Sequence, residues 1–138
     1  MIKLIIGNKG SGKTKKLIEA VNAAANASNG NVVCVEQGPA LKYDLISKVR
    51  LIDTLHYGIA GYEAFYGLLA GICASDYDVT DIYVDATLRI GGRDYWSLGS
   101  FLKRIDTLSR ESETNFVFTV SCDESDIPAE VFEFAKKL

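Results

Sequence analysis

The sequence predicts an α/β fold in three layers, α/β/α, with helices on both faces of a mostly parallel five-stranded sheet. Short, continuously apolar runs alternate along the chain with longer runs whose apolar residues recur every three or four positions. Strands that alternate with helices in this way form βαβ units, in which the strands run parallel. The strand-like runs are apolar throughout, as expected of strands covered on both sides. With 138 residues, the chain is predicted to form a single domain over residues 1–138.

The first half of the chain is predicted to contain three strands and three helices. The strands are short apolar runs rich in β-branched residues: Ile2–Ile6, Val32–Glu36 and the weaker Val49–Asp53. The helices follow them in turn: Lys13–Ser28, Ala40–Ser47 and Gly58–Ala74. The first helix places Leu17, Val21 and Ala24 on one face, and it ends at Asn29 and Gly30.

The second half is predicted to contain two strands and two helices. The strands are Asp81–Asp85 and Asn115–Val120. The helix Trp96–Glu111 has apolar residues at three- and four-residue spacing and charged residues on its other side. A final helix is predicted over Ile127–Leu138, with Pro128 in its first turn. Val131 and Phe134 would share its apolar face.

Composition and charge favour a cytoplasmic globular protein. The net charge of −3 argues against a partner held mainly by phosphate-backbone electrostatics, such as nucleic acid. The cysteines Cys34, Cys73 and Cys122 are far apart, so we expect buried free thiols in place of disulfides or a metal site. The first residues lack the pattern of a signal peptide. We expect no membrane span, because the weakly charged run Tyr57–Ser75 is shorter than the roughly 20 apolar residues needed and contains Glu63.

Residues Gly7–Thr14 fit the phosphate-loop (Walker A) pattern G-x-x-x-x-G-K-[ST] at every fixed position. Backbone N–H groups in such a loop converge on phosphate oxygens, and the following helix N-terminus also favours anions. The expected nucleotide-binding residues are Gly7, Asn8, Lys9, Gly10, Ser11, Gly12, Lys13 and Thr14. Lys13 is expected to contact the β- and γ-phosphates of ATP and to stabilise the transferring phosphoryl group. Thr14 is expected to present its hydroxyl to Mg²⁺.

Two carboxylates at strand ends complete the predicted site. Asp85 ends an apolar strand, which is the Walker B placement of a carboxylate that holds Mg²⁺ beside the phosphate loop. No glutamate follows it, because the next residues are Ala86 and Thr87. Glu36 ends the second strand and is our candidate for the catalytic carboxylate that orients water toward the γ-phosphate. The alternative for Glu36 is a solvated carboxylate at a strand end.

In the order of these elements the chain resembles the RecA-like P-loop NTPases, over Gly7–Val120. The resemblance implies the strand order 3-2-4-5-1, with the P-loop strand at one edge of the sheet. It also implies that the catalytic glutamate ends the second strand, as Glu36 does. The family senses the γ-phosphate with a polar residue, usually Gln, at the end of the strand that follows the Asp-terminated strand. Thr119, Ser121 or Cys122 would occupy that region here.

Two loops lie where the resemblance would place contacts to DNA or to a neighbouring subunit. The loop Thr87–Tyr95 contains Arg89 and Arg93, which we interpret as exposed arginines on a flexible turn. The alternatives are a phosphate contact or an arginine finger that acts on a neighbouring subunit's nucleotide. The loop Cys122–Asp126 is acidic and would repel a nucleic-acid backbone.

These features predict a protein that binds ATP and Mg²⁺ and acts as a weak or partner-activated ATPase, the partner being a second copy of the chain or another protein. A regulatory or assembly module that binds ATP without significant hydrolysis is one alternative. It is favoured by the absence of a glutamate after Asp85 and of the sensor Gln. A small nucleoside-type kinase is the other, with Glu36 or Asp123 facing the acceptor hydroxyl.

Overall fold

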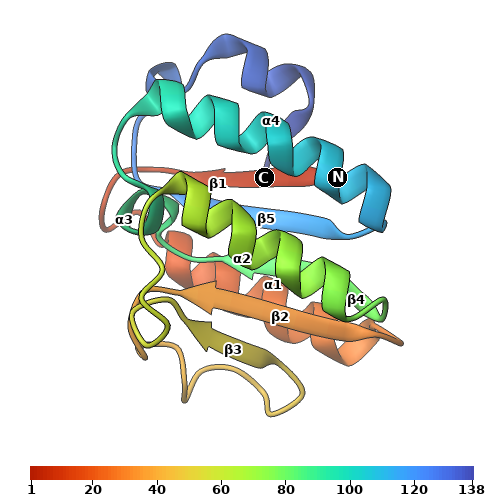
Figure 1. The fold of residues 1–138 in the computed structure, drawn as a ribbon. Coiled ribbons are helices and arrows are strands. Elements are labelled where there is room, and N and C mark those ends of the chain that lie inside the picture. Colours follow the sequence, from red (N-terminus) through yellow and green to blue (C-terminus); the bar gives the residue numbers. More distant parts are fainter.

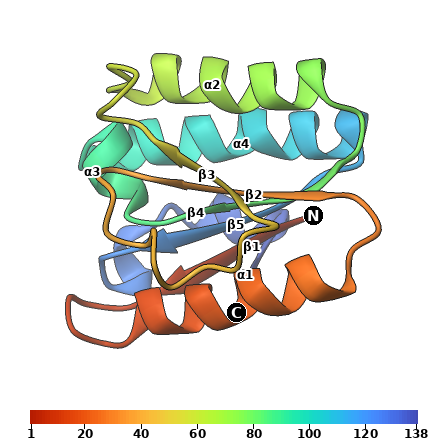
Figure 2. The same cartoon turned by 90° about the horizontal axis from the view of Figure 1, so that it is seen from below.

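The computed structural model describes residues 1–138 as a three-layer α/β/α fold, which confirms the predicted class (Figures 1 and 2). The sheet is entirely parallel, with the strand order β3-β2-β4-β5-β1-β6. Its strands are β1 (Ile2–Ile6), β2 (Asn31–Glu36), β3 (Arg50–Asp53), β4 (Val79–Val84), β5 (Asn115–Val120) and β6 (Ala135–Lys137). The helices are α1 (Lys13–Ala27), α2 (Tyr62–Ser75), α3 (Thr87–Gly91) and α4 (Tyr95–Ser112). Helix α1 covers one face of the sheet, and α2 and α4 cover the other (Figure 2).

The predicted order of the first five strands is confirmed, but the sheet has a sixth strand. The final helix predicted over Ile127–Leu138 is wrong. This segment forms a short 3₁₀ turn, η2 (Ala129–Glu133), followed by β6, and Leu138 N–H donates to the Leu4 carbonyl at 2.8 Å. The outer edge of β1 would otherwise leave its backbone groups unpaired, and β6 satisfies them. The P-loop strand β1 therefore lies inside the sheet between β5 and β6, not at its edge.

The segment from 37 to 49 is irregular, so the helix predicted over Ala40–Ser47 is also wrong. Side chains of β2 and α1 form hydrogen bonds with the backbone of this segment. Leu41 N–H donates to the Glu36 carboxylate at 2.9 Å. The Asn22 amide of α1 accepts from Ile46 N–H at 3.0 Å and donates to the Asp44 carbonyl at 3.0 Å. These bonds hold the segment against α1 without regular structure.

Apolar side chains form a core on each face of the sheet. The larger core joins the sheet to α2 and α4 and contains an aromatic cluster made of Phe65, Phe101, Phe116 and Phe118. The smaller core joins it to α1 through residues such as Leu17 and Val21. All three cysteines are buried and unpaired. None of the helices has both the length and the apolar character needed to cross a membrane.

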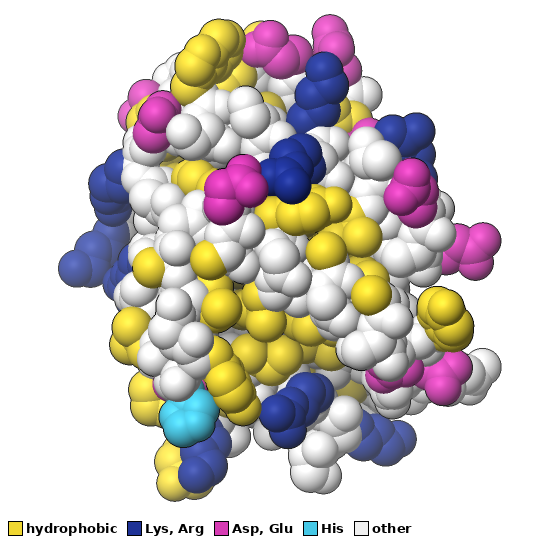
Figure 3. Space-filling model, in the orientation of Figure 1, with side chains coloured by type: hydrophobic (Ala, Val, Ile, Leu, Met, Phe, Trp, Pro, Cys, Tyr) yellow, Lys and Arg dark blue, Asp and Glu magenta, His cyan; other side chains and the backbone are white.

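On the face of the sheet that α2 and α4 cover, no helix lies over the edge formed by β2 and β3. Figure 3 shows hydrophobic side chains gathered in this area, below α2. Between α2 and the strands lies a hollow of about 260 Å³, whose lining includes Val33, Ile52, Ile72 and Val79. The opposite end of the same face is closed by the longer helix α4 and η2, which pack against each other.

Candidate functional site

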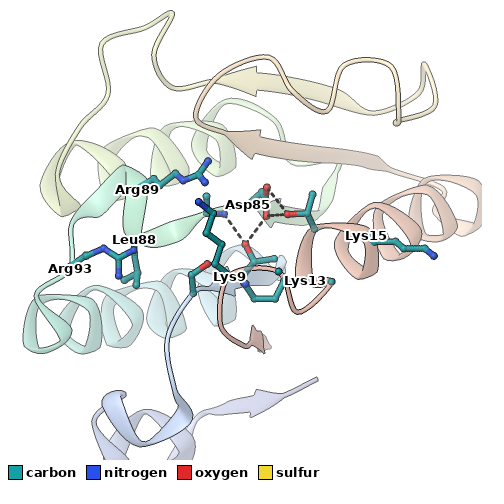
Figure 4. Close-up of a pocket in the computed structure, with 13 residues that line it drawn as sticks. Lys9, Lys13, Lys15, Asp85, Leu88, Arg89 and Arg93 are labelled. Atoms are coloured by element: carbon teal, nitrogen blue, oxygen red, sulfur yellow. Dashed lines mark hydrogen bonds between the residues drawn. The ribbon is translucent and has the colours of Figure 1, made fainter.

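Strands β1, β4 and β5 lead at their carboxyl ends to a mainly polar cavity of about 440 Å³ (Figure 4). Ligands of open parallel sheets bind at this end of the strands. The lining residues come from the loop after β1, from the start of α1, from the segment after β4 and from the end of β5: Lys9, Gly10, Gly12, Lys13, Thr14, Lys15, Asp85, Ala86, Leu88, Arg89, Arg93, Thr119 and Ser121. The structure therefore brings the predicted phosphate loop and Asp85 to one cavity.

The phosphate loop closes tightly between β1 and α1. Gly10 and Gly12 both have a φ of +85°, a left-handed conformation that glycine adopts without strain. The Lys13 ammonium donates to the Asn8 carbonyl at 3.1 Å, and Ser11 N–H donates to the same oxygen at 3.1 Å. A Cβ at Gly7 would clash with the Ser11 hydroxyl, so a larger residue there would force the Ser11 side chain to move.

The eight expected loop residues divide into two groups. Those that line the cavity are Lys9, Gly10, Gly12, Lys13 and Thr14. Those that shape the loop without lining the cavity are Gly7, Asn8 and Ser11. The Asn8 side chain donates to the Asp123 carboxylate at 3.0 Å, which ties the loop to the segment after β5.

Thr14 and Asp85 form a pair of oxygen ligands suited to Mg²⁺. The Thr14 hydroxyl lies 3.3 Å from each oxygen of the Asp85 carboxylate. Neighbouring oxygen ligands of octahedral Mg²⁺ lie about 3 Å apart, because bonds of about 2.0–2.1 Å meet at right angles. Mg²⁺ is usually held by one or two carboxylates together with substrate phosphates, and this site supplies one carboxylate beside a phosphate loop.

Thr119 positions Asp85 from the neighbouring strand. Its buried hydroxyl donates to Asp85 Oδ1 at 2.7 Å and accepts from Ala86 N–H at 2.7 Å. Ala86 has a φ of +59°, an uncommon conformation for a residue with a Cβ, and its N–H bond to Thr119 stabilises this turn. Thr119 is one of three candidates for sensing the γ-phosphate, and the structure gives it a direct contact with the carboxylate of Asp85, the predicted ligand of Mg²⁺.

Glu36 lies at the end of β2, but its side chain is buried and does not line the cavity. Its carboxylate accepts from Leu41 N–H and anchors the irregular segment that follows β2. Burial raises the pKa of Glu36, the bond from Leu41 opposes this rise, and the carboxylates of Asp85 and Asp53 add to it. In this conformation Glu36 is an anchor for the backbone, and its catalytic role stays a prediction.

We expect the Glu36→Gln variant to unfold at a higher temperature than the parent protein at pH 7. Folding raises the pKa of this carboxyl, so the ionised form destabilises the folded state. This loss of stability appears as the pH rises above 4.5, the ordinary pKa of a glutamate. Glutamine keeps an oxygen for Leu41 N–H without that charge. The gain should shrink as the pH falls toward 4, which thermal unfolding at several pH values measures. A lower unfolding temperature at pH 7 would mean that the ionised carboxylate stabilises the segment.

Positive charge dominates the cavity although the chain as a whole is acidic. Five cationic side chains and one carboxylate line it, in a protein whose net charge is −3. The cationic residues are Lys9, Lys13, Lys15, Arg89 and Arg93. The three salt bridges of the structure use other cations, namely Arg104, Arg110 and Lys137. The cavity therefore offers unpaired positive charge of the kind that binds a polyanion.

Arg89 and Arg93 are the site residues whose setting the sequence interpretation missed. They were interpreted as exposed arginines on a flexible turn, and they are exposed, but Arg89 belongs to α3 and both line the cavity. The signal available in the sequence was their position shortly after Asp85. Asp123, the alternative kinase residue, bonds to Asn8 and does not line the cavity.

No family model and no curated protein sequence matches the chain. Its fold is similar to the crystal structure of the flagellar accessory protein FlaH from Methanocaldococcus jannaschii, with a TM-score of 0.61 and 14% sequence identity. The match covers 96% of this chain and 65% of the FlaH chain, so this chain spans less than two thirds of FlaH. The likeness shows a shared fold, and the strand order of the parallel sheet is the one that the order of the motifs implied for the first five strands.

Proposed function

We propose that this protein binds ATP together with Mg²⁺ in the cavity at the carboxyl ends of β1, β4 and β5. The observation that carries the proposal is the convergence of the phosphate loop, the Thr14–Asp85 pair and five unpaired cations on one cavity. Lys13 and the backbone N–H groups of the loop would hold the phosphates. Thr14 and Asp85 would hold Mg²⁺, which neutralises charge on the β- and γ-phosphates when bound.

We propose that the protein hydrolyses ATP slowly, or only when a partner activates it. The partner would be a second copy of the chain or another protein. The cavity contains one carboxylate, Asp85, and that group bonds to Thr14 and Thr119. Glu36 would orient water only after its bond to Leu41 opened. The same observation favours, as the second candidate, a regulatory or assembly module that binds ATP without significant hydrolysis.

Thermal unfolding of the purified protein with and without Mg·ATP tests the proposed binding. A ligand that binds only the folded state stabilises it by about 2.7 kcal/mol when its concentration is 100 times the dissociation constant. We expect a rise in unfolding temperature that saturates with Mg·ATP and weakens when Mg²⁺ is removed with EDTA. An unfolding temperature unchanged by millimolar Mg·ATP would contradict the proposal.

The fate of the γ-phosphate separates the two candidate functions. We expect the parent protein to release phosphate slowly from ATP in the absence of any acceptor, and the Glu36→Gln variant to release less. Equal rates for the two proteins would show that Glu36 is not the base. Binding without phosphate release would identify the non-hydrolysing module, and turnover only with an added acceptor would identify a kinase.

A further inference from the structure

Arg89 and Arg93 face the same cavity as the phosphate loop of their own chain. Helix α3 begins two residues after Asp85, so it presents Arg89 beside the predicted metal site, and Arg93 is the second residue after α3. In Figure 4 both arginines lie on the α3 side of the cavity, while Lys9 and Lys13 come from the loop before α1. Neither guanidinium takes part in a salt bridge.

Three bonds from two other parts of the chain fix the segment that carries the arginines. Its backbone carbonyls accept from the Gln37 amide at 3.1 Å, from Gly61 N–H at 2.9 Å and from the Tyr62 hydroxyl at 2.7 Å. A Cβ at Gly91 would clash with the Tyr62 ring, which shows how closely that ring covers the segment. Leu88 and Ile90, which flank Arg89, are buried in the core. The arginines are therefore presented by an anchored segment and not by a loose turn.

Arg93 and Lys13 act on one common neighbour, the thiol of Cys122. Burial, together with the carboxylates of Asp126 and Asp123, raises the pKa of this thiol to about 11. The charges of Arg93 and Lys13 both oppose this rise, so the thiol is subject to positive charge from both sides of the cavity.

We propose that Arg89 and Arg93 bind the terminal phosphate of a nucleoside triphosphate held by the same chain. The inference rests on the proposed function and adds to it that the site distinguishes a triphosphate from a diphosphate without a neighbouring subunit. Thr14 and Asp85 would hold Mg²⁺ beside the β- and γ-phosphates, and the arginines line the same cavity from the α3 side. A guanidinium matches phosphate oxygens with two parallel N–H donors, which suits it to this task.

Dissociation constants for Mg·ATP and Mg·ADP, measured by calorimetry, test the inference. The variants are Arg89→Ala, Arg93→Ala and the double substitution. Removal of a charge-assisted bond should weaken ATP binding roughly tenfold or more, with little change for ADP. Arg110→Ala is the matched control, because Arg110 is an exposed arginine in the last turn of α4 and does not line the cavity. Unfolding without nucleotide checks that each variant is folded, and Arg89→Gln and Arg93→Gln replace any variant that is not.

The outcomes separate this inference from the proposed function. A preference for ATP over ADP that falls in the variants supports it. If the variants keep the parent's preference for ATP over ADP, the inference is overturned, but the proposed binding of ATP by the parent protein still stands. If the variants lose ATP and ADP affinity equally, the arginines do not act on the terminal phosphate. A parent protein that binds neither nucleotide overturns both proposals.

A mixing experiment tests whether the arginines act within their own chain. The Lys13→Ala protein keeps both arginines and is expected to bind no nucleotide, so it can supply them only to another chain. Adding it to the double arginine variant should leave the weakened ATP affinity unchanged. Recovery of the parent affinity in the mixture would show that the arginines act between chains and would overturn the inference.

Discussion

Replacement of Lys13 by alanine is expected to abolish the thermal stabilisation by Mg·ATP. The Lys13 ammonium forms no salt bridge and bonds only to the Asn8 carbonyl. Its removal should therefore change the stability of the nucleotide-free protein little. In the complex the ammonium would contact two phosphate groups, and each bond to a charged group contributes about 1.5–3 kcal/mol. Loss of two such bonds weakens binding by a factor of about 100 or more.

Lys16→Ala provides the matched control for this prediction. Lys16 lies on the same helix one turn beyond the loop, and it is exposed and outside the cavity lining. Both variants lose one positive charge, so a general electrostatic effect would weaken nucleotide binding equally in the two. Stabilisation of Lys13→Ala equal to that of the parent would remove the assignment of Gly7–Thr14 as a phosphate loop.

The fold class and the position of the phosphate loop follow from local sequence. The strand, loop and helix around Gly7–Thr14 are adjacent in the chain, so one pattern specifies both the elements and their connection. Asp85 is distant from the loop in sequence, but parallel strands place their carboxyl ends at one edge of the sheet. That rule predicts that Asp85 lies on the same side of the sheet as the loop, and in the structure its carboxylate is 3.3 Å from the Thr14 hydroxyl.

The features that sequence reasoning missed depend on contacts between distant segments. The segment Ile127–Leu138 shows helical spacing, but its residues Ala135–Lys137 form β6 because β1 offers an unpaired edge. Helix α3 is too short to show periodicity, and its backbone is held by Gln37, Gly61 and Tyr62. The direction in which Arg89 points therefore cannot be inferred from the neighbouring residues alone.

Glu36 shows the same limit at the level of one side chain. A glutamate at a strand end is compatible with a catalytic base and with a solvated carboxylate, and the structure shows a third role, a buried anchor. The difference lies in the irregular segment after β2, which folds back and brings the Leu41 N–H to the carboxylate.

Replacement of Phe118 by alanine is expected to lower the free energy of unfolding by about 3–5 kcal/mol. Phe118 is fully buried, and its ring centroid lies 5.8 Å from that of Phe101 and 6.4 Å from that of Phe65. The side chain thus joins β5 to both α4 and α2. Because domains of this size are stable by about 5–15 kcal/mol in total, the cavity left behind would remove a large share of that stability. The unfolding temperature should fall by roughly 10–20 °C.

Phe118→Ala and Lys13→Ala should separate folding from binding. Phe118 makes no contribution to the cavity lining, so Mg·ATP should still raise the unfolding temperature of its alanine variant, from a lower starting value. Lys13→Ala should show the reverse, with a starting value near that of the parent and no rise. Tyr77→Ala is the control for the loss of an aromatic ring, because Tyr77 is 97% exposed and its removal should cost at most about 0.5 kcal/mol. A Phe118→Ala protein as stable as Tyr77→Ala would contradict the assignment of Phe118 to the core that supports Thr119 and, through it, Asp85.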